Sequence, residues 1–375
     1  MINNTAKVRR DFITSKYYIS KMDSEYIKGR GSQINTNNRF SKYNYVQEHI
    51  EGLDEQWDLN HETELIYANP KTIVNKVESP DIPGMYSMNP YQGCEHGCIY
   101  CYARNAHEYW GYSAGMDFEK KIIVKMNAPK LLEEQFMKKT WQPSPIMLSG
   151  NTDCYQPTER KLKITRGLLE VLLKFRNPVG IITKNSLILR DLDLISELAK
   201  LRLVHVMVSI TSLDNDLRLK MEPRTTTAKQ RLKIIKDLSD AGVPVGVMTA
   251  PIIPGINSSE IPSIIEQVAL NGGTSAGMTI VRLNGAIGDI FHDWLNKTFP
   301  DRAEKVWNQI CECHGGSVND SRFGTRMRGE GKIAESIKQL HRWAVKKYMP
   351  KKDKFEYDLS AFKRPAKEGQ MDLFD

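Results

Sequence analysis

Short apolar segments alternate with amphipathic segments along most of the chain. The apolar segments predict strands at residues 84–88, 145–148, 179–183, 203–210, 243–249 and 277–283. Apolar residues with helical spacing lie between and after them, near residues 160–176, 190–201, 226–241, 258–270 and 287–298. Asp191 and Ser258 stand where capping side chains would begin two of these helices. The alternation indicates an α/β fold with a parallel sheet and right-handed crossovers.

The two ends of the chain differ from this central region. Residues 1–80 are polar, basic and weakly periodic, and we expect a weakly ordered arm there. A core over 81–300 is followed by a helical extension at 301–362 and a flexible tail at 363–375. No apolar run approaches the ~20 residues that a membrane span needs, and the first residues lack the apolar block of a secretion signal. Six cysteines are too few for a disulfide scaffold, so we expect a cytoplasmic protein.

The formal net charge of +8 is concentrated at the two ends. Residues 1–50 and 320–375 each carry a surplus of five positive charges. A neutral body with basic ends suits a surface that binds a polyanion, but solvated tails explain the same charge. In the arm, residues 29–30 and 39–40 supply basic and aromatic groups that suit single-stranded nucleic acid. Arg322, Arg326 and Arg328 alternate with glycines, a pattern that fits either phosphate binding or a salt-bridged loop.

Three cysteines, Cys94, Cys98 and Cys101, stand four and three residues apart. Thiolates are the usual ligands of iron–sulfur clusters, and three of them leave one iron of a four-iron cluster open for an outside ligand. A zinc site is the alternative, because His96 and His107 lie nearby in the sequence. Zinc sites usually pair cysteines in two short repeats or add histidines at set distances, and this spacing follows neither pattern.

Polar segments follow the predicted strands at their carboxyl ends, where ligands gather in parallel β/α folds. The cysteine loop follows the first strand, and the later segments are 149–157, 183–186, 209–212 and 250–255. Each segment alone fits an ordinary loop. Because all of them fall at the same edge of the sheet, they predict one shared cavity.

The cysteine spacing, with Tyr100 before the third cysteine, resembles the signature of the radical SAM superfamily. Residues 87–331 further resemble its spore photoproduct lyase-related branch, often described as predicted DNA repair photolyases. The segments that carry this second resemblance are Tyr100-Cys101-Tyr102-Ala103-Arg104, Thr152-Asp153-x-Tyr155-Gln156-Pro157, Glu222-Pro223-Arg224, residues 250–255 and Arg322-Phe323-Gly324-x-Arg326. Periodicity alone fits a flat sheet or a barrel, whereas the resemblance implies a partial, open barrel of six β/α units.

The resemblance also implies an enzyme with two cofactors, a [4Fe–4S] cluster and S-adenosyl-L-methionine. Cys94, Cys98 and Cys101 would ligate the cluster, whose open iron would bind the amino and carboxylate groups of the methionine. The other implied contacts are Tyr100 near the adenine, Ser149, Asn151 and Asp153 near the amino group, Lys184 at the carboxylate, and Ser209 and Thr211 at the ribose. An electron from a donor such as flavodoxin or ferredoxin would cleave the cofactor, and the resulting 5′-deoxyadenosyl radical would take a hydrogen atom from the substrate.

The other cysteines leave alternatives open. Cys154 stands where the branch is expected to have proline. It could donate a hydrogen atom to a product radical, as a thiol does in spore photoproduct lyase, or be a buried and inert thiol. Cys311, Cys313 and His314 could in principle form a second metal centre with Cys154, although their separation along the chain is long.

The last residues, Gln370-Met371-Asp372-Leu373-Phe374, resemble the peptide that bacterial polymerases and repair proteins insert into the sliding clamp. Together with the basic ends, the resemblance predicts a radical SAM enzyme that acts on nucleic acid in the manner of a DNA repair photolyase. A radical SAM enzyme for a peptide or small metabolite is one alternative. A non-catalytic, metal-stabilised adaptor for nucleic acid or the clamp is the other.

Overall fold

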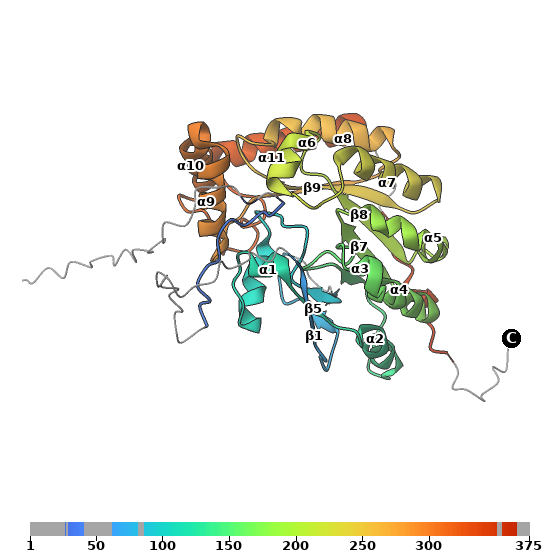
Figure 1. Ribbon diagram of the computed structural model, residues 1–375. Coiled ribbons are helices and arrows are strands. Elements are labelled where there is room, and N and C mark those ends of the chain that lie inside the picture. The colour runs from blue at the N-terminus through green and yellow to red at the C-terminus, as the bar shows by residue number, and fades with distance from the viewer. Residues whose placement is uncertain (1–26, 28, 41–61, 82–85, 351–354, 366–375) are drawn as a thin grey trace, which may run out of the picture.

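The computed structural model describes residues 27, 29–40, 62–81, 86–350 and 355–365 of the chain (Figure 1). Its larger sheet has seven strands in the order β10-β9-β8-β7-β6-β3-β2. The strands are β2 (Val74–Lys76), β3 (Tyr86–Met88), β6 (Ile146–Leu148), β7 (Val179–Thr183), β8 (Val204–Ser209), β9 (Val245–Ile252) and β10 (Ala276–Ile280). Neighbouring strands are parallel except β2 and β3, which are antiparallel.

The six parallel strands from β3 to β10 correspond to the six strands predicted from the sequence. They neighbour one another in their order along the chain, as a series of β/α units requires. β2 and β10 form the two edges of the described sheet, so the sheet does not close into a complete barrel. The prediction of an α/β fold with an open parallel sheet is therefore confirmed.

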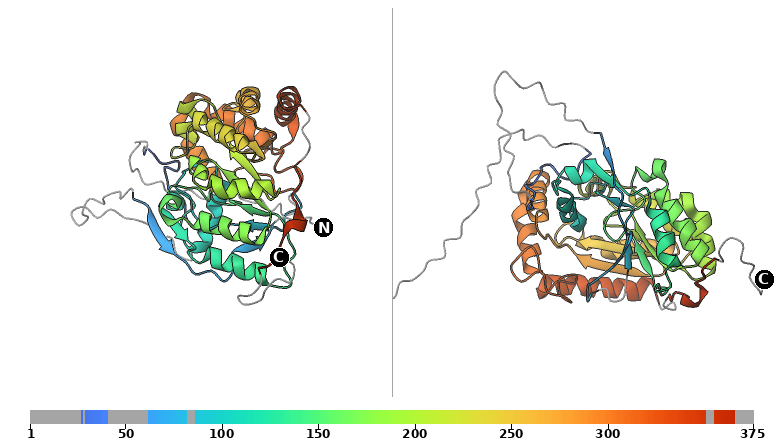
Figure 2. Two further views of the ribbon diagram at one scale, coloured as in Figure 1. Left: turned by 90° about the vertical axis from the view of Figure 1, so that its right-hand side faces the viewer. Right: turned by 90° about the horizontal axis from the view of Figure 1, so that it is seen from below.

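Amphipathic helices precede, connect or follow these strands, as Figure 2 shows from two sides. They are α2 (Ala128–Met137), α3 (Glu159–Leu162), α4 (Ile164–Phe175), α5 (Leu192–Lys200), α6 (Asn215–Met221), α7 (Ala228–Asp240), α8 (Ile261–Leu270) and α9 (Ile287–Thr298). The helix predicted at 160–176 is divided in two, because Lys163 has a φ of 54° and separates α3 from α4. In α4 the buried face contains Leu168, Leu169 and Leu172, as the apolar spacing predicts.

The two predicted helix caps are wrong. Asp191 precedes α5, but its side chain makes no capping hydrogen bond. Its buried carboxylate instead accepts hydrogen bonds from Arg166 and Arg190. Ser258 is the first residue of a short 3-10 helix, η3 (Ser258–Glu260), and α8 begins after Glu260 without a side-chain cap. At Asp191, binding to the two arginines replaced the local capping preference.

A second, three-stranded sheet places part of the N-terminal region against the cysteine segment. Its strands are β1 (Glu64–Tyr67), β5 (Lys121–Val124) and β4 (Tyr91–Gln92), in the order β1-β5-β4. β1 is parallel to β5, and β4 is antiparallel to it. The sequence analysis did not predict this sheet, since its strands are short. Three stretches of the predicted arm, residues 30–33, β1 and β2, thus contribute to the described fold.

The C-terminal extension is helical, as predicted, and the chain after its last long helix returns to the core. Its helices are α10 (Ala303–Glu312) and α11 (Gly331–Tyr348), and α11 packs on α8. The ring of Phe362 packs against Phe136 and Phe175, and Arg364 donates hydrogen bonds to three backbone carbonyls near the end of α2. The first residues of the predicted flexible tail are therefore bound to the core. Among the described helices, none is both long and apolar enough to cross a membrane.

Replacement of Phe362 by alanine tests whether this returning segment stabilises the core. The half-buried ring packs against two aromatic residues, so F362A should lower the free energy of unfolding by about 2 kcal/mol. Urea titration followed by tryptophan fluorescence measures the change. The control L270A removes a side chain that is 74% exposed and should change stability by less than about 0.5 kcal/mol. Equal stability of F362A and wild type would show that the segment lies loosely on the surface.

Candidate active site

The cysteine loop connects β4 to a 3-10 helix, η1 (Tyr102–Trp110). Gly97 in this loop has a φ of 68°, and a Cβ atom there would lie 2.9 Å from Glu119 Oε2. Cys94 and Cys98 are buried, and Cys101 is half-buried. Burial is the main cause that raises the pKa of Cys94, and negative charge on Asp153, Cys98 and Cys101 adds to it. The three thiols thus share one buried electrostatic environment, as ligands of one metal centre must.

A buried ion pair holds the middle of this loop. Arg104 donates hydrogen bonds to the carbonyl of Cys98 at 2.9 and 3.1 Å and binds Glu119 at 2.5 Å. Both charged side chains are fully buried. Glu119 Oε2 accepts a hydrogen bond from the backbone N–H of Gly31, and Glu119 Oε1 accepts one from the backbone N–H of Ser32. One carboxylate therefore joins the N-terminal segment to the cysteine loop.

Arg30 was predicted to contribute to a nucleic-acid surface, and the structure corrects this. Its side chain is only 3% exposed. Its guanidinium donates to the carbonyl of Glu119 at 3.2 Å. A buried arginine bound to the backbone cannot offer its charge to a polyanion in solution.

A second buried carboxylate, Glu222, fixes the other side of the loop. It accepts hydrogen bonds from the hydroxyl of Tyr100, from Thr211 Oγ1 at 2.8 Å and from Arg231 Nη2 at 2.5 Å. Burial acts to raise the pKa of Glu222, but the charges of Arg231 and Lys184, with these hydrogen bonds, lower it to about 2. The carboxylate therefore stays ionised and orients Tyr100 beside the cysteines. Thr211, predicted to bind the ribose, donates its hydroxyl proton to this carboxylate instead.

Asp153 was predicted to accept the amino group of a methionine, but the protein itself occupies its carboxylate. One oxygen accepts a hydrogen bond from the backbone N–H of Tyr155 at 2.9 Å and another from the hydroxyl of Thr183 at 2.8 Å. The other accepts the backbone N–H of Lys184 at 2.8 Å and lies 3.4 Å from His96 Nδ1. Asp153 thus joins the loop after β6 to the end of β7. This arrangement makes it a positioning residue.

The two other residues predicted for the amino group lie in the same loop. Ser149 has a φ of 75°, and its hydroxyl oxygen accepts the backbone N–H of Cys154 at 2.8 Å. The backbone of Asn151 donates to Asn89 Oδ1 at 2.8 Å, and its side chain is exposed. Ser209 is buried at the end of β8, where its carbonyl accepts a hydrogen bond from Arg231 at 2.9 Å. Of these residues, Asn151 has the most accessible side chain.

Lys184 brings a cation to the cysteine loop. Its ammonium lies 6.0 Å from the ring centre of Tyr100 and makes no hydrogen bond or ion pair with any described residue. Burial acts to lower the pKa of Lys184, but negative charge on Cys98 and Glu222 outweighs it and raises the pKa. The side chain is therefore charged and available to an anionic ligand, and its role at the methionine carboxylate stays a prediction.

Cys154 does not reach this site. Its side chain is fully buried within the main hydrophobic core, and burial raises the pKa of its thiol well above the ordinary value. The buried and inert alternative is thus the one that fits the structure, because a hydrogen donor must contact the substrate.

The structure brings no second metal centre together. Cys313, directly after α10, is buried in a separate hydrophobic cluster that includes residues of α11. His314 Nε2 lies 2.7 Å from the carbonyl oxygen of Val281. In the parts of the chain that the structure describes, no three His, Cys, Asp or Glu side chains converge on a point that could hold a single metal ion. A four-iron cluster binds each thiolate to a different iron, so it does not need such convergence.

An exposed aromatic cluster lies on η1, directly after the cysteine loop. The rings of Phe40 and Tyr109 have centres 4.7 Å apart, and the guanidinium of Arg39 lies 4.8 Å from the ring centre of Phe40. Arg39 also pairs with Glu108 at 3.0 Å. The side chain of Asn38 donates to two carbonyls of the η1 region and fixes this segment there. The predicted basic and aromatic pair at 39–40 is thus placed beside the candidate site.

The glycine-rich arginine loop matches the salt-bridged alternative. Arg322 binds Asp320 at 2.9 Å and Glu330 at 2.6 Å. Arg326 binds Asp81 at 2.5 Å. Two of the three arginines predicted as phosphate ligands are therefore already neutralised by carboxylates.

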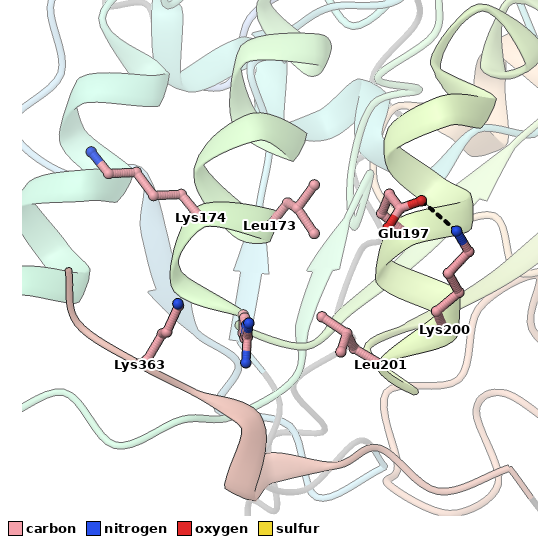
Figure 3. Close-up of a pocket in the computed structure, with 7 residues that line it drawn as sticks. Leu173, Lys174, Glu197, Lys200, Leu201 and Lys363 are labelled. Atoms are coloured by element: carbon pink, nitrogen blue, oxygen red, sulfur yellow. Dashed lines mark hydrogen bonds and ion pairs between the residues drawn. The ribbon is translucent and has the colours of Figure 1, made fainter. Parts of the chain in front are cut away.

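A cavity of about 490 Å³ lies at the opposite end of the sheet (Figure 3). It is lined by the ends of α4 and α5, just before β7 and β8, and by Lys363. Lys174 and Lys200 on its rim pair with Glu133 and Glu197, each at 2.6 Å. Because ligands of parallel β/α folds gather at the carboxyl ends of the strands, we assign the chemistry to the cysteine loop instead.

Sequence reasoning missed the residues that hold the loop: Arg104, Glu119, Glu222 and Arg231. Glu222 and Arg104 were noticed only within segments that carry the family resemblance. A charged residue that is destined for burial looks like a surface residue until its partner is known. The signal that could have found them is their position next to a cysteine motif, where buried charges often orient ligands.

Comparison with known proteins gives three findings. The family model described as the radical SAM superfamily matches residues 88–268. An uncharacterized protein of Mycobacterium tuberculosis is 33% identical over 234 residues, which are 62% of this chain and 69% of the relative. An uncharacterized protein of Methanocaldococcus jannaschii is 30% identical over 199 residues, 53% of this chain and 71% of the relative.

Among solved structures, spore photoproduct lyase complexed with dinucleoside spore photoproduct superposes with a TM-score of 0.57 and 14% sequence identity. The match covers 76% of this chain and 80% of the lyase. At this identity, the likeness shows a shared fold.

Replacement of Glu222 by glutamine tests the buried network. E222Q leaves the buried charge of Arg231 without its partner, and should lower the free energy of unfolding by about 3–5 kcal/mol at neutral pH. The control D193N breaks an ion pair whose carboxylate is 59% exposed and should cost less than about 1 kcal/mol.

The difference in unfolding free energy between wild type and E222Q should also depend on pH. The pKa of Glu222 is about 2 in the folded protein and 4.5 in its ordinary state, so its stabilisation is fully present above pH 4.5 and is lost as the pH falls towards 2. The difference in unfolding free energy between wild type and E222Q should shrink over that range. A constant difference from pH 6 to pH 3 would contradict an ionised, buried Glu222.

Proposed function

Because the chain belongs to the radical SAM superfamily, we propose that Cys94, Cys98 and Cys101 hold a [4Fe–4S] cluster at which the protein reductively cleaves S-adenosylmethionine. Membership of this superfamily implies both cofactors and an enzyme. When bound, they supply the one-electron chemistry and the 5′-deoxyadenosyl radical that takes a hydrogen atom from the substrate. The single observation that supports this use of the three cysteines is their position in one loop, with Cys94 and Cys98 buried, where Arg104 binds the carbonyl of Cys98 and Glu222 binds the hydroxyl of Tyr100.

The donor set fits an iron–sulfur cluster. Burial raises the pKa of Cys98 to about 12, and the pKa of Cys94 is raised as well. Without iron these thiols hold their protons. Iron–sulfur ligation requires thiolates, so assembly must release protons from the buried loop. The same burial limits the access of water and of competing hydrogen donors.

The protein's own groups position the second cofactor. Lys184 offers an unpaired ammonium for the methionine carboxylate. Tyr100, held by Glu222, presents its ring to the same space and would pack near the adenine. Asn151 is the accessible polar side chain of the loop after β6 and takes the place that we predicted for Asp153 near the amino group. Ser209 and Thr211 would shape the wall on the β8 side.

We propose nucleic acid as the substrate class. Supporting observations are the exposed cluster of Arg39, Phe40 and Tyr109 beside the cysteine loop, which suits base stacking, and the net charge of +8. The fold is shared with a spore photoproduct lyase whose structure contains a dinucleoside photoproduct. A peptide or small metabolite is the alternative substrate, and it would be favoured by an enzyme that does not bind oligonucleotides at low salt.

Several further proposals rest on the sequence. An electron donor such as flavodoxin or ferredoxin would reduce the cluster. The clamp-binding peptide, Gln370–Phe374, lies outside the described residues, so a sliding-clamp partner stays a prediction. The domain boundaries at 80, 300 and 362 and the cytoplasmic location stay predictions too.

Product analysis of cysteine variants tests the proposed function. After anaerobic reconstitution, wild type should contain about equal iron and sulfide and should convert S-adenosylmethionine to methionine and 5′-deoxyadenosine under dithionite. C94A, C98A and C101A should each lose most of the iron and all of the cleavage, because a three-thiolate site has no spare ligand. The matched control C311A removes a half-exposed cysteine on α10 and should retain both.

Oligonucleotide in the same assay separates the substrate classes. Added single-stranded DNA or RNA should change the yield of 5′-deoxyadenosine. Iron retained in all three alanine variants would overturn the cluster assignment. Zinc in place of iron, with no cleavage, would favour the non-catalytic adaptor.

Lys184 supplies an independent prediction about cofactor binding. K184Q removes the unpaired ammonium and should raise the Kd for S-adenosylmethionine roughly 10-fold, the value of one charge-assisted hydrogen bond. Equilibrium dialysis with reconstituted protein measures this, and iron content should be unchanged. The control K200Q alters a lysine of the remote cavity and should bind like wild type. An unchanged Kd in K184Q would assign Lys184 a role outside cofactor binding.

A further inference from the structure

A second cation, Arg282, stands at the edge of the sheet that carries the candidate site. It follows β10 at its carboxyl end and lies between two buried apolar residues, Val281 and Leu283. The backbone on both sides is fixed, since Val281 donates to Ile252 and Leu283 donates to Val318, each at 2.9 Å. Arg282 itself is half-buried. Its position is therefore set by the sheet rather than by a loop.

The guanidinium of Arg282 makes no hydrogen bond or ion pair with any described residue. Two carboxylates, Asp81 and Asp320, are close enough to act on its charge. However, Asp81 is bound by Arg326 and Asp320 by Arg322. Arginine stays charged even where burial lowers its pKa. A charged, half-buried group without a partner is unfavourable unless a ligand supplies one.

Helix η1 relates Arg282 to the cysteine loop. Its first residue, Tyr102, follows Cys101, donates its hydroxyl proton to the carbonyl of Gly150, and has a side chain that is 54% exposed. Further along the same helix, Asn105 Nδ2 donates to the carbonyl of Asn284 at 2.7 Å. The segment after β10 that carries Arg282 is therefore held against the helix that begins at the cysteine loop.

The two cations differ in depth and therefore in what they can bind. Lys184 lies over Tyr100, next to the cysteines, where we place the methionine carboxylate. Arg282 lies near Asp81 and Asp320, the carboxylates that Arg326 and Arg322 bind. A guanidinium offers several donors in a planar fork, which matches the oxygens of a phosphate group.

We propose that Arg282 binds a phosphate group of the substrate beside η1, and that the substrate is a phosphodiester or phosphate ester. The inference rests on the proposed function, because it places the phosphate next to the radical chemistry. It goes further by naming the residue and the charged group that it recognises. Arg322 and Arg326, the arginines singled out from sequence, hold the neighbouring carboxylates and so leave Arg282 free.

The test compares charged and uncharged linkages. Full-length, anaerobically reconstituted protein with S-adenosylmethionine is titrated with a single-stranded oligonucleotide and with the same sequence carrying neutral methylphosphonate linkages. R282Q should bind the phosphodiester roughly 10-fold more weakly than wild type and should bind the methylphosphonate equally well. R282K should recover part of the loss, since it restores charge without the fork. The matched control R342Q changes an exposed arginine of α11 and should discriminate like wild type.

The outcomes separate this inference from the proposed function. R282Q could still prefer the phosphodiester over the methylphosphonate oligonucleotide as strongly as wild type does. If oligonucleotide binding and cofactor cleavage are also intact, this result overturns the role of Arg282 alone. Cofactor cleavage without binding of either oligonucleotide overturns the phosphate substrate and leaves the radical chemistry standing. Binding that depends on Arg282, without any cleavage, supports the phosphate site and overturns the proposed function. A mononucleotide that shows the same dependence on Arg282 as the oligonucleotide identifies a phosphate ester as the source.

Discussion

The ionised carboxylate of Glu222, buried between the sheet and the cysteine loop, is the interaction on which the geometry of the site depends. It binds Arg231 on α7, Thr211 after β8 and Tyr100 within the loop. The loop has no regular hydrogen bonding of its own, so its shape must come from outside contacts. Ile99 also donates to the carbonyl of Met221, next to Glu222 in sequence. One charged group thereby couples the position of the cysteines to the end of β8 and to α7.

The pair of Arg104 and Glu119 does the same from the opposite side. Such buried pairs contribute little net stability, because removing both charges from water is unfavourable. Their effect here is on position: each fixes several backbone groups that would otherwise be unsatisfied. The protein thus uses directional charge contacts where a metal-binding loop needs defined geometry, and apolar packing everywhere else in the sheet.

The sequence predicted the larger sheet because its strands are buried runs of apolar residues, such as β7, and such runs are recognisable locally. It singled out Lys184 as a cation at the end of a strand, and the role of this residue at the cofactor stays a prediction. It did not show the partners of Asp153 or Asp191, whose carboxylates accept hydrogen bonds from Thr183, Lys184 and Arg166. Tyr100 and Glu222 are separated by 122 residues, and no local pattern reveals that contact. Sequence reasoning therefore located the site and the types of residue in it, while the assignment of individual charges required the structure.

The distribution of paired and unpaired cations separates structural from ligand-binding roles. Arg104, Arg231, Arg322 and Arg326 all bind carboxylates within the protein. Lys184 and Arg282 do not, and both stand at carboxyl ends of strands beside the cysteine loop. In the same place, burial keeps the pKa of Cys94 and Cys98 high, so these two thiols add no negative charge before a cluster binds. A carboxylate or phosphate of a bound cofactor or substrate would supply the partners that Lys184 and Arg282 lack within the described chain. The pairing of charges in the folded chain thus leaves its free cations where ligands of a parallel β/α fold gather.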